Sequence, residues 1–96
     1  MAIYRVNQFY AAEGKGEMLK AFFESLVEYI ISSKGCISCQ LLQDDQNELH
    51  FVVLEQWQSK EAHQASLQNY PADKMQEVMP LFGTPPIGDF YTLVKE

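Results

Sequence analysis

The sequence has 96 residues, of which 47% are hydrophobic and 21% charged, a balance that excludes a disordered chain and a second independent domain. Seven basic against thirteen acidic residues give a net charge of −6, so we expect no nucleic-acid partner, since phosphates bind a positive surface. No segment approaches the roughly 20 apolar residues of a membrane span, and the first ten residues lack the pattern of a signal peptide. We therefore predict one cytoplasmic domain over residues 1–96, without a membrane partner.

The first half of the chain predicts a strand, a helix and a hairpin. The β-branched and aromatic residues of Ile3 to Ala11 favour a strand, which ends at a glycine-containing turn. From Glu17 to Ser33 apolar residues recur every three or four positions, as in an amphipathic helix, and Lys34-Gly35 favours its end. Cys36 to Gln43 and Glu48 to Gln58 predict two strands joined by a polar turn, so the pair forms a hairpin.

The second half predicts two short helices and a final strand. Ser59 is a suitable N-cap for a helix that runs to about Leu67. Pro71 favours the first turn of a further helix, which Pro80 ends. Ile87 to Lys95 predicts the last strand. The order is β-α-β-β-α-β, the ferredoxin-like arrangement of an α+β fold with an antiparallel sheet.

Both faces of the third predicted strand carry large apolar side chains. One face has Leu49, Phe51, Val53, Glu55 and Trp57, and the other has His50, Val52, Leu54 and Gln56. A sheet that is covered on one side only would alternate apolar with polar residues. Because the helices cover one face, we predict that a second copy of the chain covers the other, sheet against sheet, in a homodimer.

The two cysteines, Cys36 and Cys39, form a Cys-x-x-Cys pair. Positions three apart in a strand face opposite sides, so we expect the two sulfur atoms not to converge. A zinc site would need two more ligands, and a redox pair would need a helix amino terminus. We therefore predict buried, unreactive thiols and no metal.

Three short motifs link the chain to a known family. Gly35-Cys36 opens the second strand, Leu54-Glu55-Gln56-Trp57 closes the third, and Ser59-Lys60-Glu61-Ala62 follows at once. In these motifs and in element order the chain resembles the antibiotic biosynthesis monooxygenase (ABM) family of dimeric α+β barrels. Its members include cofactor-independent oxygenases of polyketide phenols, quinol monooxygenases and heme-degrading monooxygenases, and others isomerise. The fold alone does not choose among these activities.

At some positions where members of this family carry site residues, this chain has a different residue. Asn7 stands where heme-degrading members place a pocket Asn, but Gln76 stands where they carry a His, so the iron ligand is missing. Polyketide-oxidising members resemble the chain at Trp57. Their Asn and Tyr, however, correspond to Val53 and His63 here.

The candidate catalytic residues are Asn7, Trp57 and His63. Asn is disfavoured in strands, so Asn7 either orients a phenol or dioxygen or bonds to nearby backbone. Trp57 either donates its indole N–H to a substrate oxygen or packs as a core aromatic. His63 is suited to accept a phenolic proton, with an unperturbed pKa of ~6.5, or points to solvent. His50 lies on the opposite strand face, where we expect it to meet the dimer partner.

Four apolar residues are predicted to form the wall of the substrate site: Phe9, Phe23, Phe51 and Met79. Met75 and Met79, with Phe82, fit core packing equally well, although flexible methionines suit an adaptable wall.

The leading hypothesis is a cofactor-independent monooxygenase that oxidises a small phenol, quinol or related aromatic with dioxygen. Such a substrate supplies its own electrons once it is deprotonated, so the protein needs only to hold it dry and stabilise the anion. An alternative is a non-catalytic, dimeric small-molecule-binding protein of the same fold. A further alternative is a heme-binding and heme-degrading monooxygenase.

Overall fold

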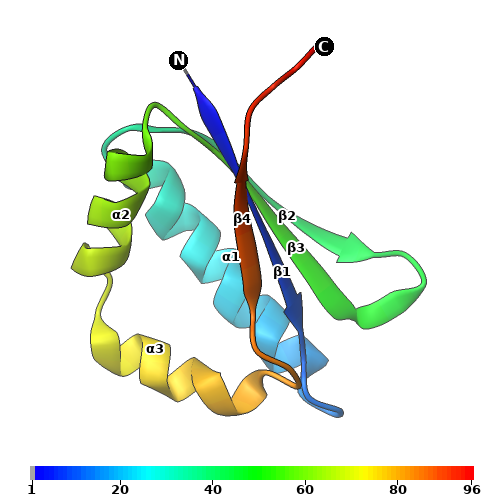
Figure 1. Cartoon of the computed structure of the whole chain (residues 1–96). Helices are drawn as coiled ribbons and strands as arrows, with labels where there is room; N and C mark the ends of the chain where they lie inside the picture. Colours follow the sequence, from blue (N-terminus) through cyan, green and yellow to red (C-terminus); the bar gives the residue numbers. More distant parts are fainter. Residues whose placement is uncertain (1) are drawn as a thin grey trace.

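The computed structural model describes residues 2–96 and shows a four-stranded antiparallel sheet with its helices on one side (Figure 1). The elements are β1 (Ile3–Tyr10), α1 (Gly16–Ser32), β2 (Cys36–Asp44), β3 (Asn47–Trp57), α2 (Lys60–Asn69), α3 (Ala72–Val78), the 3-10 turn η1 (Met79–Leu81) and β4 (Ile87–Tyr91). The strand order is β2-β3-β1-β4, so β1 and β3 are central. The predicted ferredoxin-like α+β fold is confirmed. No helix within residues 2–96 has the length and apolar character to cross a membrane.

The core lies between α1 and the helix-facing side of β1 and β3. Along β3 the predicted alternation is confirmed, because Phe51, Val53, Glu55 and Trp57 are buried and the residues between them are half-buried. From α1, Leu19 and Phe23 are fully buried against this face. Each such side chain contributes about 1.5–3 kcal/mol of hydrophobic free energy relative to exposure.

Two local features fix the connections on either side of β2 and β3. Gly35 has a φ of +88°, the left-handed conformation that favours glycine, and lies so close to α2 that a Cβ atom there would be 2.5 Å from the Cβ of Ala62. The Ser59 hydroxyl accepts a hydrogen bond from the Ala62 N–H at 3.1 Å, which confirms the predicted N-cap. These contacts join the start of β2 to the start of α2.

A β-bulge near the start of β2 corrects the prediction for the two cysteines. Cys36 pairs with Trp57 and Cys39 pairs with Glu55, with a register shift between Cys36 and Ser38. The extra residue interrupts the alternation, so both cysteines lie on the helix-facing side rather than on opposite faces. Burial, and then the negative charge of Glu55, raises the pKa of Cys36 and raises that of Cys39 to about 12. Both thiols therefore stay protonated at neutral pH.

The last strand is shorter than predicted and ends at Tyr91 rather than Lys95. Tyr91 pairs with Tyr4, near the beginning of β1, and the two strands are antiparallel. Residues beyond Tyr91 therefore run past the start of β1 and have no strand beside them, as Figure 1 shows for the C-terminal segment. In consequence the side chain of Val94 is 95% exposed.

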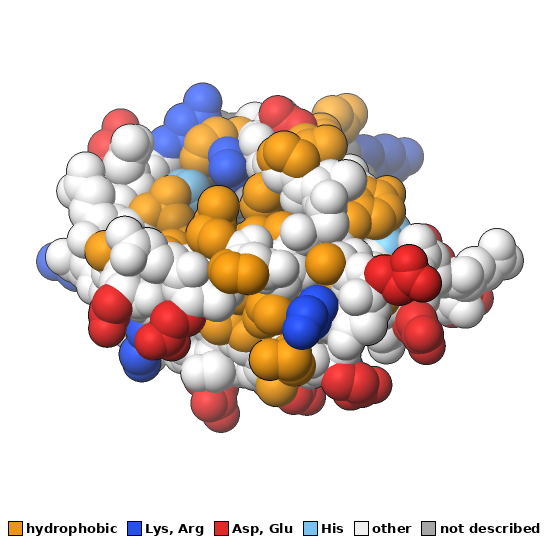
Figure 2. Space-filling view, turned by 90° about the horizontal axis from the view of Figure 1, so that it is seen from below, with side chains coloured by type: hydrophobic (Ala, Val, Ile, Leu, Met, Phe, Trp, Pro, Cys, Tyr) orange, Lys and Arg blue, Asp and Glu red, His pale blue; other side chains and the backbone are white. Residues whose placement is uncertain are grey.

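Several large apolar side chains remain exposed on the helices as well. They include Met18, Ile31, Leu67 and Met79. At the end of the molecule seen in Figure 2, apolar side chains occupy the centre and charged side chains of both signs surround them, with acidic side chains along the lower edge.

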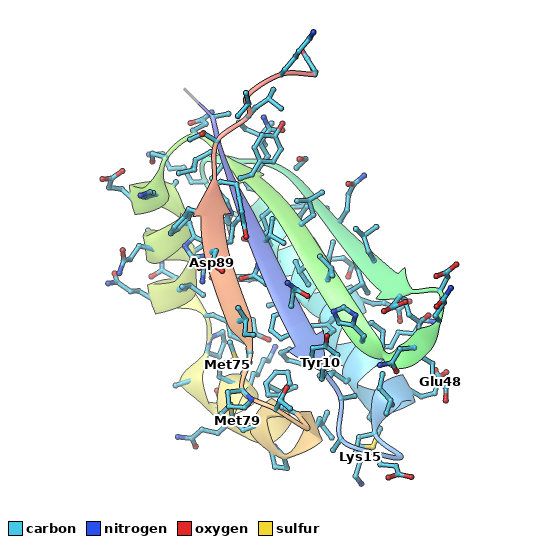
Figure 3. All side chains as sticks on the ribbon, turned by 45° about the vertical axis from the view of Figure 1, so that its right-hand side comes forward. Tyr10, Lys15, Glu48, Met75, Met79 and Asp89 are labelled. Carbon is cyan, nitrogen blue, oxygen red and sulfur yellow. The ribbon has the colours of Figure 1, made fainter. Side chains whose placement is uncertain are left out.

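Within residues 2–96, no element covers the sheet face opposite the helices. Figure 3 views the sheet from this side, with Tyr10 at the end of β1. The ring of Tyr10 stacks on His50 at a centroid distance of 4.3 Å, and Nδ1 of His50 lies 3.0 Å from Oδ2 of Asp44. Val52 and Leu54 are half-buried in the middle of the same face. The structure thus confirms which face His50 occupies, while its place in a dimer interface stays a prediction.

Candidate functional site

A cavity of about 110 Å³ lies between the helix-facing side of the sheet and the three helices. β1 contributes Arg5, Asn7 and Phe9, β3 contributes Val53, Glu55 and Trp57, and α2 contributes His63. These residues converge because every second side chain of two neighbouring strands points to the same face. Aromatic and aliphatic side chains of α1 and α3 complete the wall, so a few polar groups stand in apolar surroundings.

Glu55 is the centre of the polar network, although its side chain lies on the apolar face of β3 and is only 6% exposed. The Trp57 indole N–H donates to Oε1 at 2.7 Å, and the Asn7 amide donates to Oε2 at 2.6 Å. The same Asn7 amide lies 3.3 Å from the backbone carbonyl of Val53, to which it also donates. Burial raises the pKa of Glu55 above its usual value, while the two hydrogen bonds and the charge of Arg5 oppose that rise.

His63 faces the same carboxylate from α2. Its Nε2 lies 4.0 Å from Oε1 of Glu55, and its ring stands edge-on to Trp57 at a centroid distance of 5.6 Å. Burial, with a smaller contribution from the positive charge of Arg5, lowers the pKa of His63 below 6.5. The imidazole is therefore neutral at pH 7 and able to accept a proton. The imidazolium that forms would have a carboxylate 4.0 Å away.

Arg5 is held in place by three neighbours on β1 and β4. Its Nε–H donates to Oδ1 of Asn7 at 3.0 Å, and its guanidinium carbon lies 4.7 Å from the centre of the Phe90 ring. Gly88 leaves room for the guanidinium, because a Cβ atom there would overlap Nη2 of Arg5 and lie 2.7 Å from Oδ1 of Asn7. Arg5, Asn7 and Glu55 therefore form one connected group across β1 and β3.

The three predicted catalytic residues, Asn7, Trp57 and His63, all line this cavity. Their roles stay predictions, but the geometry changes what each one offers a substrate. The N–H groups of Asn7 and Trp57, predicted to bond a substrate oxygen, both donate to Glu55 instead. Of the three, His63 remains the group able to exchange a proton with a bound molecule.

Of the four residues predicted to form the apolar wall, Phe9 lines the cavity and the other three do not. Phe23 and Phe51 are fully buried in the core, with their ring centroids 5.7 Å apart. Met79 belongs to the 3-10 turn and is 57% exposed, whereas Met75, one turn earlier, contributes to the wall (both are labelled in Figure 3).

Glu55 and Arg5 were not among the residues predicted for the site. A signal for both was present, because each is an ionisable residue at an inward position of a central strand. The strand register places the two residues side by side, since Arg5 pairs with Glu55 across β1 and β3. Within residues 2–96, the cavity included, no group of three or more His, Cys, Asp or Glu side chains is arranged to hold a metal ion.

The family model of the antibiotic biosynthesis monooxygenases matches residues 2–78. The chain belongs to this family. Among curated protein sequences, none matches the chain significantly.

Several solved structures share the fold of this chain. The protein PA3566 of Pseudomonas aeruginosa is 20% identical over 98% of this chain and 95% of its own, with a TM-score of 0.89. Rv0793 of Mycobacterium tuberculosis is 15% identical over 100% of this chain and 98% of its own, with a TM-score of 0.87. A mutant of SnoaB, a cofactor-independent oxygenase of Streptomyces nogalater, is 14% identical over 99% of this chain and 95% of its own, with a TM-score of 0.83. Identities this low establish the common fold and no more.

Proposed function

We propose that the protein is a monooxygenase that oxidises a small phenol or quinol with dioxygen, without a cofactor, in the cavity beside His63 and Glu55. The observation that carries this proposal is a neutral imidazole that faces a buried carboxylate at an apolar cavity. Membership of the monooxygenase family supports it, as does the fold shared with SnoaB, a cofactor-independent oxygenase.

The volume of the cavity favours a substrate with one aromatic ring. An engineered apolar cavity of about 150 Å³ in another protein binds benzene. The cavity here has about 110 Å³ and is only partly enclosed, so part of a ligand can extend outward. A single ring with short substituents fits this space, whereas a macrocycle such as heme does not.

In the proposed reaction Nε2 of His63 accepts the phenolic proton, and the Glu55 carboxylate stabilises the imidazolium. The phenolate is electron-rich enough to pass electrons to dioxygen, while the apolar wall excludes water from the reacting ring. For a quinol, one oxygen atom enters the ring and the other leaves as water with two hydrogen atoms of the substrate. The product is a hydroxyquinone, and all the electrons that reduce dioxygen come from the quinol.

We further propose that the protein is a homodimer in which the open sheet faces of two copies pack together. The half-buried Val52 and Leu54 in the centre and the exposed Leu42 and Ile87 on the flanking strands give that face an apolar character. A second copy would present the same apolar residues, so one surface would cover the other with matched chemistry.

Oxygen uptake tests the catalytic proposal. One-ring and fused-ring phenols, quinols and anthrones are incubated aerobically with the protein, and the spontaneous rate of each compound is subtracted. We expect enzyme-dependent uptake with one-ring compounds and a loss of about 10²–10⁴-fold in His63→Gln, the range for removal of a general base. His50→Gln is the matched control, because His50 lies on the other face of the sheet, and light scattering checks that this variant has the same oligomeric state as the wild type. Uptake no faster than the spontaneous rate across the whole panel would contradict the proposal.

A second candidate function is ligand binding without turnover. It is favoured by the bonds of Asn7 and Trp57 to Glu55, because neither the amide nor the indole N–H is then free to stabilise a reaction intermediate. In that case phenols would quench the fluorescence of Trp57 at saturable concentrations, and no compound of the panel would be oxidised.

A further inference from the structure

We propose that Arg5 selects the ligand of the cavity by binding an anionic oxygen, carried by a one-ring aromatic as a carboxylate or as an ionised phenol. This inference rests on the proposed function, because it names the substrate class of the same cavity. It assigns Arg5 a specificity-determining role in place of the donor roles predicted for Asn7 and Trp57.

Arg5 supplies the N–H donors that remain for a ligand at this cavity. The Asn7 and Trp57 N–H groups that face the cavity both donate to Glu55. Within residues 2–96, the guanidinium of Arg5 makes one hydrogen bond, through Nε–H, so the N–H groups of both terminal nitrogens remain for a ligand. A guanidinium stays charged at any physiological pH, and its fork geometry suits a carboxylate.

The charge of Arg5 also favours an anionic ligand. Arg5 is the only arginine of the chain, and it lies at an inward strand position rather than on the surface. In the part of the chain that the structure describes, the ion pairs within 4.0 Å are His50 with Asp44 and His63 with Glu55. The guanidinium therefore has no carboxylate partner at that distance. A half-buried positive charge at a largely apolar cavity attracts an anion more strongly than the same charge would in water.

The orientation of the Arg5 guanidinium is fixed by its neighbours. Asn7 fixes Nε, the Phe90 ring supports the guanidinium plane, and Gly88 leaves the space that the group occupies. Lys60 brings a second positive charge to the same ring, with Nζ 5.2 Å from its centre. The guanidinium is thus positioned before a ligand arrives, so little side-chain entropy is lost on binding.

Calorimetric titration with two matched pairs of ligands tests the proposal and separates the two sources of the anion. Benzoate is compared with benzamide, its neutral isostere, and ionised 4-nitrophenol with 4-nitroanisole. We expect the anion of at least one pair to bind about 10–100-fold more tightly than its neutral partner, the range for a hydrogen bond to a charged group. Preference within the first pair identifies a carboxylate as the recognised group, and preference within the second identifies a phenolate.

Three variants assign the preference to Arg5. Arg5→Gln should abolish the preference for the anion, and Arg5→Lys should keep part of it. Gly88→Ala should weaken the preference, because the new Cβ atom displaces a guanidinium that is still present. Lys15→Gln is the control, since it removes one positive charge from the exposed turn before α1. If Arg5→Gln does not fold, the lysine and Gly88 variants give the same test.

Equal binding of anion and neutral isostere in both pairs, or a preference that survives displacement or removal of Arg5, would overturn the proposal. The experiments distinguish failure of this proposal from failure of the proposed function. Oxidation of quinols that does not depend on Arg5 would leave the monooxygenase in place, and anion-selective binding without oxygen uptake would leave Arg5 in place.

Discussion

Replacing Glu55 with glutamine tests the buried network with the smallest change of shape. In the native protein, one carboxylate oxygen accepts the Trp57 N–H at 2.7 Å and the other accepts the Asn7 amide at 2.6 Å. A glutamine amide has one accepting oxygen, so one of the two donors loses its acceptor and faces an NH₂ group. Trp57 is 1% exposed, so water does not replace the lost partner. A buried donor without an acceptor costs about 1–3 kcal/mol, and we expect Glu55→Gln to lower the free energy of unfolding by that amount.

The difference in free energy of unfolding between the wild type and Glu55→Gln should depend on pH, with a definite sign. The pKa of Glu55 is raised in the folded protein, so the folded state binds this proton more readily than the unfolded chain does. The resulting stabilisation is complete below the unfolded pKa of about 4.3 and is lost as the pH rises through the folded pKa. Glutamine does not titrate. The stability difference between wild type and variant should therefore be largest in acid and shrink as the pH rises.

Urea unfolding from about pH 4 to pH 8, followed by Trp57 fluorescence and far-ultraviolet circular dichroism, measures the difference. Glu24→Gln is the control, since Glu24 is exposed on α1 and its loss should change stability by less than about 0.5 kcal/mol. Equal stability of wild type and Glu55→Gln at every pH would refute the account of the network. A difference that grows as the pH rises would refute the raised pKa.

Three further predictions concern the base, the dimer and the turn before β2. If His63 is the base, kcat/KM for phenol oxidation should rise with pH and reach half its maximum below about pH 6.5, because burial lowers the pKa of His63; a profile that falls over this range would contradict that role. Leu54→Lys places a charge in the centre of the open sheet face, so light scattering should show a dimer for the wild type and a monomer for the variant, and a variant that stays dimeric would locate the interface elsewhere. Gly14→Ala should lower the free energy of unfolding by about 1–2 kcal/mol, the cost of a left-handed alanine. Thermal unfolding should show a larger loss of stability for Gly35→Ala, because the new Cβ atom would also overlap Ala62. Equal losses of stability in the two glycine variants would mean that Ala62 moves away from the new Cβ atom at no cost.

The sequence was sufficient to predict the two faces of the sheet, because alternation is a local property. The spacing of Phe51, Val53 and Trp57 along β3 fixes which side chains point inward, whatever the rest of the chain does. The same alternation predicts that Asn7 and Trp57 lie on one face of the sheet. The Ser59 cap and the left-handed Gly35 were also predictable, since each depends on residues close in sequence.

Features that depend on distant partners were not predictable. The bulge in β2 that places Cys36 and Cys39 on one face arises from its pairing with β3. The last strand ends early because β1 begins beside Tyr91, a limit that the apolar residues after it do not reveal. The bond between Asn7 and Glu55 joins positions 48 residues apart, so neither residue alone indicates that the amide is engaged.

Mass spectrometry of the product formed under isotopically labelled dioxygen tests the central claim most directly. The wild-type protein is incubated with a one-ring quinol, with His63→Gln and a protein-free sample in parallel. The account predicts a hydroxyquinone that carries one labelled oxygen atom and forms faster than in either parallel sample. A product whose new oxygen comes from water, or one that forms equally fast without the protein, would contradict the assignment of monooxygenase chemistry to this cavity.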